Sequence, residues 1–134
     1  MFLITQDNYL NRSDTDVELE ILLIASPIKL EIGKTCVIVD DIIDSGGTIV
    51  NAAKALKERG AKEVYVYITH GVLSGEAVKK IKSSVIKNLV ITDTIDNSDK
   101  IKNVRNIEVL PISSLMGEAI KRISNSTSVS DLFK

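Results

Sequence analysis

The sequence has little cysteine, almost no net charge and no long hydrophobic run, and the cysteine shortage already excludes two kinds of site. Its 134 residues include one cysteine, Cys36, which rules out an internal disulfide framework and a zinc site built from several cysteines. The apolar neighbours Val37 and Ile38 predict that Cys36 is a small buried hydrophobic residue. This cysteine content fits a cytosolic protein.

Charge and hydropathy argue against two classes of partner. Seventeen basic and eighteen acidic residues give a net charge of -1, and no basic patch stands out, so we expect no nucleic-acid partner. The longest strictly apolar stretch, Ile21 to Ala25, is far shorter than the roughly 20 residues of a membrane span. Met1 to Ile4 is too short for a signal-peptide core. We therefore expect a cytoplasmic protein with no membrane partner.

Two common phosphate-binding motifs are also missing. Gly33-Lys34-Thr35 ends like a Walker A loop, but the first glycine of that motif would fall on Ile28, and the segment precedes a predicted strand. No GxGxxG motif is present, so dinucleotide binding has no support.

From residue 37 onward, short runs of branched apolar residues alternate with helical periodicities, a pattern typical of a parallel sheet covered by helices. Strands are predicted at residues 37–39, 64–69, 89–92 and 107–110, and helices from residue 49 to Gly60 and from Gly75 to about Lys82. Another helix is predicted from an apolar stripe that we expect to pack in the core: Ile112, Leu115, Met116, Ala119, Ile120 and Ile123. The predicted class is α/β, a three-layer sandwich with a mainly parallel central sheet.

The length is that of one ordinary domain, and no internal repeat or break in composition divides it. We take residues 1–33 as a divergent N-terminal segment of the same domain, in which residues 19–25 fit either a strand or a buried helical turn. Residues 94–106 are predicted to form a surface connection, and residues 124–130 a polar tail.

The chemistry is concentrated where the strand at 37–39 runs into acids, a Gly-Gly loop and a helix. Gly46 and Gly47 allow backbone N–H groups to converge on an anion at the helix N-terminus. Ser45 and Thr48 add hydroxyl donors to the same phosphate cradle, and Asp44 could cap the helix or accept a hydrogen bond from a substrate hydroxyl.

Asp40 and Asp41 follow the predicted strand, at the edge where open α/β sheets bind their ligands. Such a pair suits a vicinal diol, and Mg²⁺ held largely through water would offset its repulsion of a nearby phosphate. The alternative is that Asp40, Asp41 and Asp44 are solvated loop acids, with Asp44 as helix cap, beside an ordinary tight turn. Composition alone leaves both interpretations open.

One segment consists of branched apolar residues followed by Asp-Asp and then by Asp-Ser-Gly-Gly-Thr. This segment resembles the phosphoribosyl pyrophosphate (PRPP) signature of type I phosphoribosyltransferases. Five further blocks resemble PRPP synthetase in particular, and the likeness covers about residues 33 to 133. They are Gly33–Cys36, Ala55–Ala61, Thr69–Gly75, Thr92–Ile95 and the tail Ser128–Phe133. The resemblance implies that residues 34–134 form the C-terminal, phosphoribosyltransferase-like domain of such an enzyme.

By position, the resemblance implies that Asp40 and Asp41 hold the ribose hydroxyls of ribose 5-phosphate or PRPP, with Mg²⁺. It implies that five residues hold the 5-phosphate: Asp44, Ser45, Gly46, Gly47 and Thr48. It places His70, the one histidine, near a ligand pocket, although a histidine at a strand end is more often structural. The tail residues Ser128, Val129 and Ser130 resemble a segment that meets a regulatory phosphate or nucleotide, the alternative being a plain polar tail.

The family reaction moves a diphosphate from ATP onto ribose 5-phosphate, and such transfers depend on Mg²⁺ and cationic side chains. Family enzymes are about twice as long, and upstream of Lys34 the only cations here are Arg12 and Lys29. We therefore expect this chain alone to be inactive or to need an N-terminal half. The alternatives are a non-catalytic regulatory module that forms a homo-oligomer or joins a synthetase subunit, and, ranked last, a small phosphoribosyltransferase.

Overall fold

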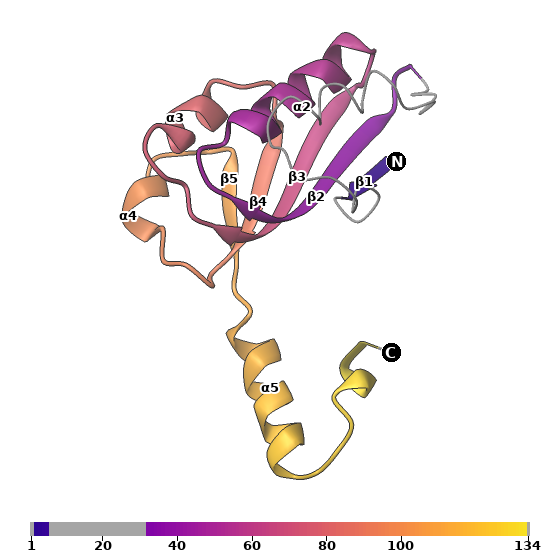
Figure 1. Ribbon diagram of the computed structural model, residues 1–134, viewed down its shortest axis with the longest axis vertical. Coiled ribbons are helices and arrows are strands. Elements are labelled where there is room, and N and C mark those ends of the chain that lie inside the picture. The colour runs from indigo at the N-terminus through magenta and orange to yellow at the C-terminus, as the bar shows by residue number, and fades with distance from the viewer. Residues whose placement is uncertain (1, 6–31, 134) are drawn as a thin grey trace, which may run out of the picture.

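The computed structural model describes residues 2–5 and 32–133, whose strands form one five-stranded parallel sheet (Figure 1). The strands are hydrogen-bonded in chain order: β1 (Phe2–Thr5), β2 (Thr35–Ile43), β3 (Glu63–Gly71), β4 (Asn88–Thr92) and β5 (Ile107–Leu110). Ile38 of β2 lies opposite Val66, which lies opposite Leu89, so buried residues form rows across the sheet. The α/β class and the parallel sheet predicted from the sequence are confirmed.

Three helices connect β2 to β5: α2 (Gly47–Glu58), α3 (Ala77–Lys82) and α4 (Ser98–Ile101). Because the strand order rises by one at each step, right-handed connections place successive helices on the same face of the sheet. Figure 1 shows α2 and α3 together on one side. The buried residues of α2 are the predicted stripe Ile49, Ala52, Ala53 and Leu56.

The two faces of the sheet differ in burial. Residues that point toward α2 and α3 are almost fully buried: Cys36, Ile38, Val64, Val66, Ile68, Leu89 and Ile91. On the other face Val37 and Tyr65 are half-buried and Tyr67 is 44% exposed. Among the described residues, therefore, helices form a layer on one face of the sheet only. No helix in this part of the chain is long and apolar enough to cross a membrane.

The strand and helix boundaries differ from the predicted ones where pairing extends an element. β2 and β3 continue past residues 39 and 69 because Ile42 pairs with His70 and Ile43 with Gly71, so the two acids of the signature lie within β2. The first helix ends as predicted, since Gly60 has a φ of 94°. The connection at 94–106 contains α4 and the buried Asn97. Residues 19–25 and the cations Arg12 and Lys29 lie outside the described residues.

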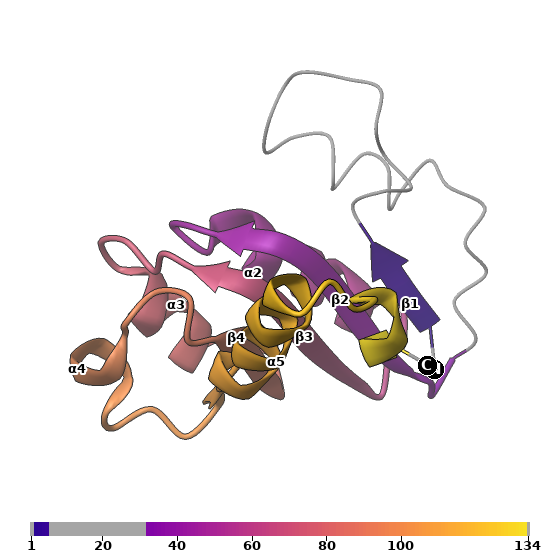
Figure 2. The ribbon, with the colours of Figure 1, turned by 90° about the horizontal axis from the view of Figure 1, so that it is seen from below.

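The prediction that the C-terminal apolar stripe packs in the core is wrong. The stripe lies on α5 (Ser113–Ser124), none of whose residues is buried. Four large side chains are 43 to 67% exposed: Leu115, Met116, Ile120 and Ile123. Figure 1 shows the reason, because α5 stands away from the sheet beyond β5, and in Figure 2, viewed from below, it lies in front of the strands. The last described element is a short 3-10 helix, η2 (Ser130–Phe133).

Candidate functional site

The loop between β2 and α2 is short, and its geometry depends on one glycine. Gly46 is buried, precedes the first residue of α2 and has a φ of 75°, a left-handed conformation that side chains disfavour. The first helical hydrogen bond runs from Val50 N–H to Gly46 O, at 3.1 Å. The N–H groups of a first helical turn have no partners within the helix, and they are suited to bind an anion.

Two neighbouring segments fix this loop in place. Ser74 N–H, after β3, donates to Asp44 O at 3.1 Å. A Cβ added to Gly46 would lie 3.6 to 3.7 Å from Ile81 and Ala77 of α3, so the loop packs closely on that helix. The carboxylate of Asp44 is on an exposed residue, and no side chain caps α2. The interpretation of Asp44 as the helix cap is therefore wrong, because Gly46 occupies that position.

A cation that sequence reasoning missed lies beside this loop. Lys80 of α3 donates from Nζ to Ser45 O at 3.4 Å. The family resemblance places such cations upstream of the signature strand, whereas Lys80 follows it in the sequence. Lys80 is 35 residues from Ser45, and only the packing of α3 on the loop brings them together. The helix around Lys80 was predicted, but its position against the loop was not.

The two acids of the signature occupy different environments. Asp40 is half-buried and Asp41 is exposed, and Asp41 N–H donates to Asp40 Oδ1 at 2.8 Å. Burial raises the pKa of Asp40, and the Asp41 side chain raises it further, while the hydrogen bond from the Asp41 backbone opposes both effects. Asp40 therefore holds a proton more readily than an ordinary aspartate does.

The donor set limits how a metal could be held. Within residues 2–5 and 32–133, no group of three or more His, Cys, Asp and Glu side chains is arranged to bind an ion. Mg²⁺ commonly uses one or two carboxylates together with waters and substrate phosphates. Asp40 and Asp41 fit that mode, in which the ion is shared with a phosphate ligand.

His70 lies at the same edge of the sheet, where it pairs with Ile42. Its Nδ1 is 2.9 Å from Thr94 Oγ1. Thr94 in turn donates to Thr69 O at 3.2 Å, and Thr92 to the same carbonyl oxygen at 2.7 Å. If Thr94 donates to that carbonyl, its oxygen accepts from Nδ1–H, which leaves Nε2 of the exposed ring as the acceptor. Thr92 and Thr94 belong to the block Thr92–Ile95 that resembles PRPP synthetase, but the sequence predicted no role for them.

The predicted regulatory residues are attached to α5. Arg122 Nη1 donates to Ser128 O at 2.9 Å, and the hydroxyls of Ser128 and Ser130 are 3.1 Å apart. Arg122 also donates from Nε to Glu118 at 3.0 Å. The tail segment containing Ser128, Val129 and Ser130 therefore has a cation beside it, which sequence reasoning missed. The bond from Arg122 to Ser128 O joins this segment to α5.

Comparison with known proteins gives a consistent result. Residues 27–134 match the phosphoribosyl synthetase-associated domain family. The chain is similar to ribose-phosphate pyrophosphokinase from Hyphomonas neptunium, with 58% identity over 75% of this chain and 32% of that protein. It is also similar to ribose-phosphate pyrophosphokinase from Rhizobium meliloti, with 48% identity over 91% of this chain and 38% of that protein. The chain thus spans about a third of the length of these relatives.

A solved structure supports the same conclusion. The chain superposes on the crystal structure of phosphoribosylpyrophosphate synthetase from Mycobacterium smegmatis with a TM-score of 0.66 and 36% identity. The match covers 71% of this chain and 32% of that one.

Proposed function

The chain belongs to the phosphoribosyl synthetase-associated domain family, and from this premise we propose that the loop between β2 and α2 binds ribose 5-phosphate or PRPP. The observation that carries the proposal is the left-handed Gly46 at the start of α2, three residues after β2, whose last four residues include Asp40 and Asp41. In this proposal the backbone of Gly46 and Gly47 and the hydroxyls of Ser45 and Thr48 bind the phosphate.

The remaining groups at this edge have separate roles in the proposal. Asp40 and Asp41 accept hydrogen bonds from the ribose hydroxyls, Asp44 accepts one from a hydroxyl nearer the phosphate, and Lys80 adds positive charge beside Ser45. Bound Mg²⁺ would neutralise phosphate charge between the carboxylates and the ligand. His70 lies at the same edge of the sheet, and its hydrogen bond with Thr94 holds the ring there.

The family reaction, transfer of a diphosphate from ATP to ribose 5-phosphate, is proposed only for an assembly that contains more than this chain. Phosphoryl-type transfers need cations placed on the developing charge, each worth about 10³ to 10⁵ in rate. Among the described residues, Lys80 is a cation that contacts this loop, through Ser45 O. We propose that the ATP site and the remaining cations come from additional residues, such as those that make up the other two thirds of the relatives.

The test is calorimetric titration of ribose 5-phosphate with Mg²⁺ into the chain and into an Asp44→Ala, Thr48→Ala variant. Each substitution removes one hydrogen bond that involves a charged group, worth about 1.5 to 3 kcal/mol, so affinity should fall at least about 100-fold. An Asp99→Ala, Thr127→Ala variant changes the same residue types at exposed positions elsewhere and should bind like the unchanged chain.

Equal affinity in the two double variants would contradict the assignment of the loop. An ATP-dependent PRPP assay on the same material separates binding from catalysis. We expect binding without turnover, and turnover by this chain alone would contradict the proposed need for additional residues.

A second candidate function, a non-catalytic module that acts by association, is favoured by the exposed stripe of α5. Soluble proteins seldom expose such a continuous apolar surface unless a partner covers it. We propose a second copy of the chain as that partner, because the same chain also carries a sheet face that no helix among the described residues covers, on which Tyr67 is 44% exposed. A full-length synthetase subunit is the alternative occupant that the association experiment below distinguishes.

A further inference from the structure

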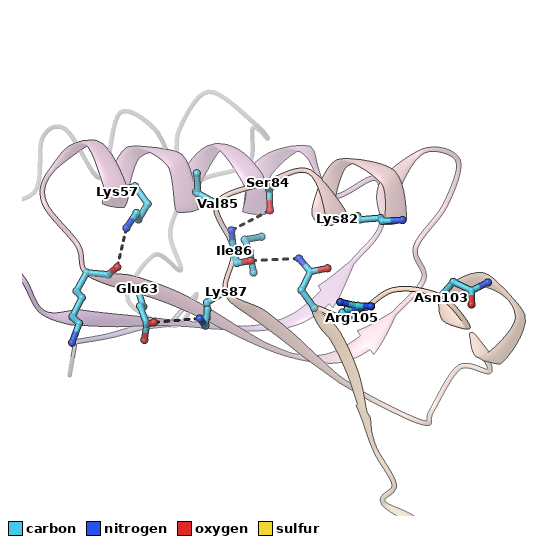
Figure 3. Close-up of a pocket in the computed structure, with 11 residues that line it drawn as sticks. Lys57, Glu63, Lys82, Ser84, Val85, Ile86, Lys87, Asn103 and Arg105 are labelled. Carbon is cyan, nitrogen blue, oxygen red and sulfur yellow. Dashed lines mark hydrogen bonds and ion pairs between the residues drawn. The ribbon is translucent and has the colours of Figure 1, made fainter.

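A groove of about 790 Å³ lies at the amino-terminal ends of β3, β4 and β5, the sheet edge opposite the loop before α2 (Figure 3). Its lining includes five cations and one carboxylate: Lys57, Lys62, Lys82, Lys87, Arg105 and Glu63. They come from the end of α2, the start of β3, the end of α3 and the segments before β4 and β5. A strongly positive groove is unexpected in a chain whose net charge is -1.

Among residues 2–5 and 32–133, no carboxylate neutralises most of this positive charge. Lys87 Nζ lies 3.5 Å from Glu63 Oε1, and Lys57 Nζ donates to the backbone oxygen of Lys62 at 2.8 Å. Within the part of the chain that the structure describes, the side chains of Lys62, Lys82 and Arg105 form no hydrogen bond or ion pair. Cations gathered in a concave site focus the electrostatic field and raise the local concentration of anions.

The floor of the groove is held rigidly, unlike a merely solvated basic face. Asn106 Nδ2 donates to Ile81 O at 3.1 Å and more weakly to Ile86 O at 3.4 Å. Ser84 Oγ donates to Ile81 O at 2.8 Å and accepts from Ile86 N–H at 3.1 Å. Ile86 itself is 3% exposed. A fixed floor lowers the entropy cost of binding, because only the long basic side chains need to be ordered.

We propose that this groove binds an anion with two or three linked phosphates, at a site separate from the loop before α2. Its volume lies within the range of about 300 to 1,000 Å³ that is typical of small-molecule sites. In Figure 3 Lys57 and Lys87 lie toward one end of the groove and Arg105 and Lys82 toward the other. Cations spread in this way match an extended anion better than a single phosphate ion.

The probe is inorganic triphosphate, titrated calorimetrically into the full chain and into a Lys62→Gln, Arg105→Gln variant. We expect the affinity to fall at least ten-fold in this variant. A Lys54→Gln, Lys121→Gln variant loses the same charge at exposed positions outside the groove and should change affinity less than two-fold. A Lys62→Arg, Arg105→Lys variant keeps the charge and should retain binding.

Amide chemical shifts locate the bound probe. Perturbation of residues 84–87, retained in the Asp44→Ala, Thr48→Ala variant, supports the groove and separates this result from the proposed function of the loop. Perturbation confined to residues 44–48, or equal losses in the groove and control variants, overturns the proposal.

Three further titrations define the ligand class. Orthophosphate should bind at least ten-fold more weakly than triphosphate, and equal binding would overturn the need for linked phosphates. Binding of a nucleoside triphosphate at residues 84–87 supports the proposal. Its affinity relative to that of inorganic triphosphate shows whether the groove prefers a nucleotide or an inorganic polyphosphate. Tighter binding of hexaglutamate than of triphosphate would overturn the proposal in favour of an acidic protein segment.

Discussion

Asp40 is a carboxylate whose surroundings oppose its charge. Burial raises its pKa, and the adjacent Asp41 side chain acts in the same direction. The native state therefore binds a proton at Asp40 more tightly than the unfolded chain does. Stability decreases as pH rises from the ordinary aspartate pKa through the raised value, and at neutral pH the ionised Asp40 is a net cost. Unfavourable environments of this kind are common at functional sites.

We predict that Asp40→Asn makes the chain more stable at pH 7, because asparagine removes the buried charge and can still accept the hydrogen bond from Asp41 N–H. The gain should shrink as pH falls and vanish below about pH 3, where aspartate is protonated in both states. Urea denaturation at several pH values measures this difference. A stability gain that does not change with pH would contradict the raised pKa as its cause.

The same substitution separates stability from binding. The Asp40→Asn variant would lack the charge that Mg²⁺ and the ribose hydroxyls require in the proposed site, so ligand affinity should fall while stability rises. Asp96→Asn is a useful contrast, because the Ser98 backbone N–H lowers the pKa of Asp96 at an exposed position, and neutralising it should bring no such gain at pH 7.

At the scale of elements, the end of β3 depends on a single buried amide. Asn97 is 3% exposed, and its Nδ2 donates to Gly71 O at 2.6 Å and to Ile95 O at 3.2 Å. These bonds join the last residue of β3, which follows His70, to the start of α4. The Asn97 Oδ1 atom is buried and has no hydrogen-bond partner among the described protein groups.

We predict that Asn97→Asp destabilises the chain by about 3 kcal/mol or more at pH 7, because it replaces two donations by a buried charge facing carbonyl oxygens. The loss should be smaller in acid, where a protonated aspartate can donate one hydrogen bond. Thermal and urea unfolding measure it, with the exposed Asn103→Asp as the matched control. A loss no larger than that of the control would show that the amide does not hold these elements together.

The types of the elements were predictable because each type depends on the local sequence pattern. The length of an element and its surroundings depend instead on the neighbouring elements that pair or pack with it. Branched apolar runs identified β2 to β5, and the stripe from Ile49 to Leu56 identified α2. The continuation of β2 through Asp40 and Asp41 comes from pairing with β3, which no local pattern reports. Asn97 was predicted to lie on the surface, because a polar loop sequence does not show which amide is buried.

For the whole molecule, the sheet separates two charged regions that the sequence presents very differently. The acids and glycines at the carboxyl edge are contiguous from residue 40 to residue 48, so reading along the chain finds them. The five cations at the amino edge span residues 57 to 105 and lie on separate segments of the chain. The net charge of -1 gives no sign of a basic patch, because these side chains come together only in the folded structure.

The exposed stripe of α5 follows from topology as well as from hydropathy. Successive right-handed connections use one face of the sheet, so the described helices leave Tyr67 on the other face 44% exposed. α5 then leaves the sheet with Ile120 63% and Ile123 67% exposed. Within the described residues, the chain thus carries two apolar surfaces that no helix or strand covers, an arrangement suited to pairing between two copies.

We predict that the chain self-associates and that Ile120→Lys weakens this association at least about ten-fold, since burial of an isoleucine contributes about 1.5 to 3 kcal/mol. Sedimentation velocity over a range of concentrations measures the effect. Ser114→Lys adds the same charge at an exposed position of α5 outside the stripe and should associate like the unchanged chain. The unfolding midpoint of dilute protein should not change with Ile120→Lys, because that side chain is outside the core. A chain that is monomeric at every concentration would refute pairing between copies. If such a monomer binds an immobilised full-length synthetase, and Ile120→Lys abolishes that binding, the stripe is assigned to contact with the synthetase subunit.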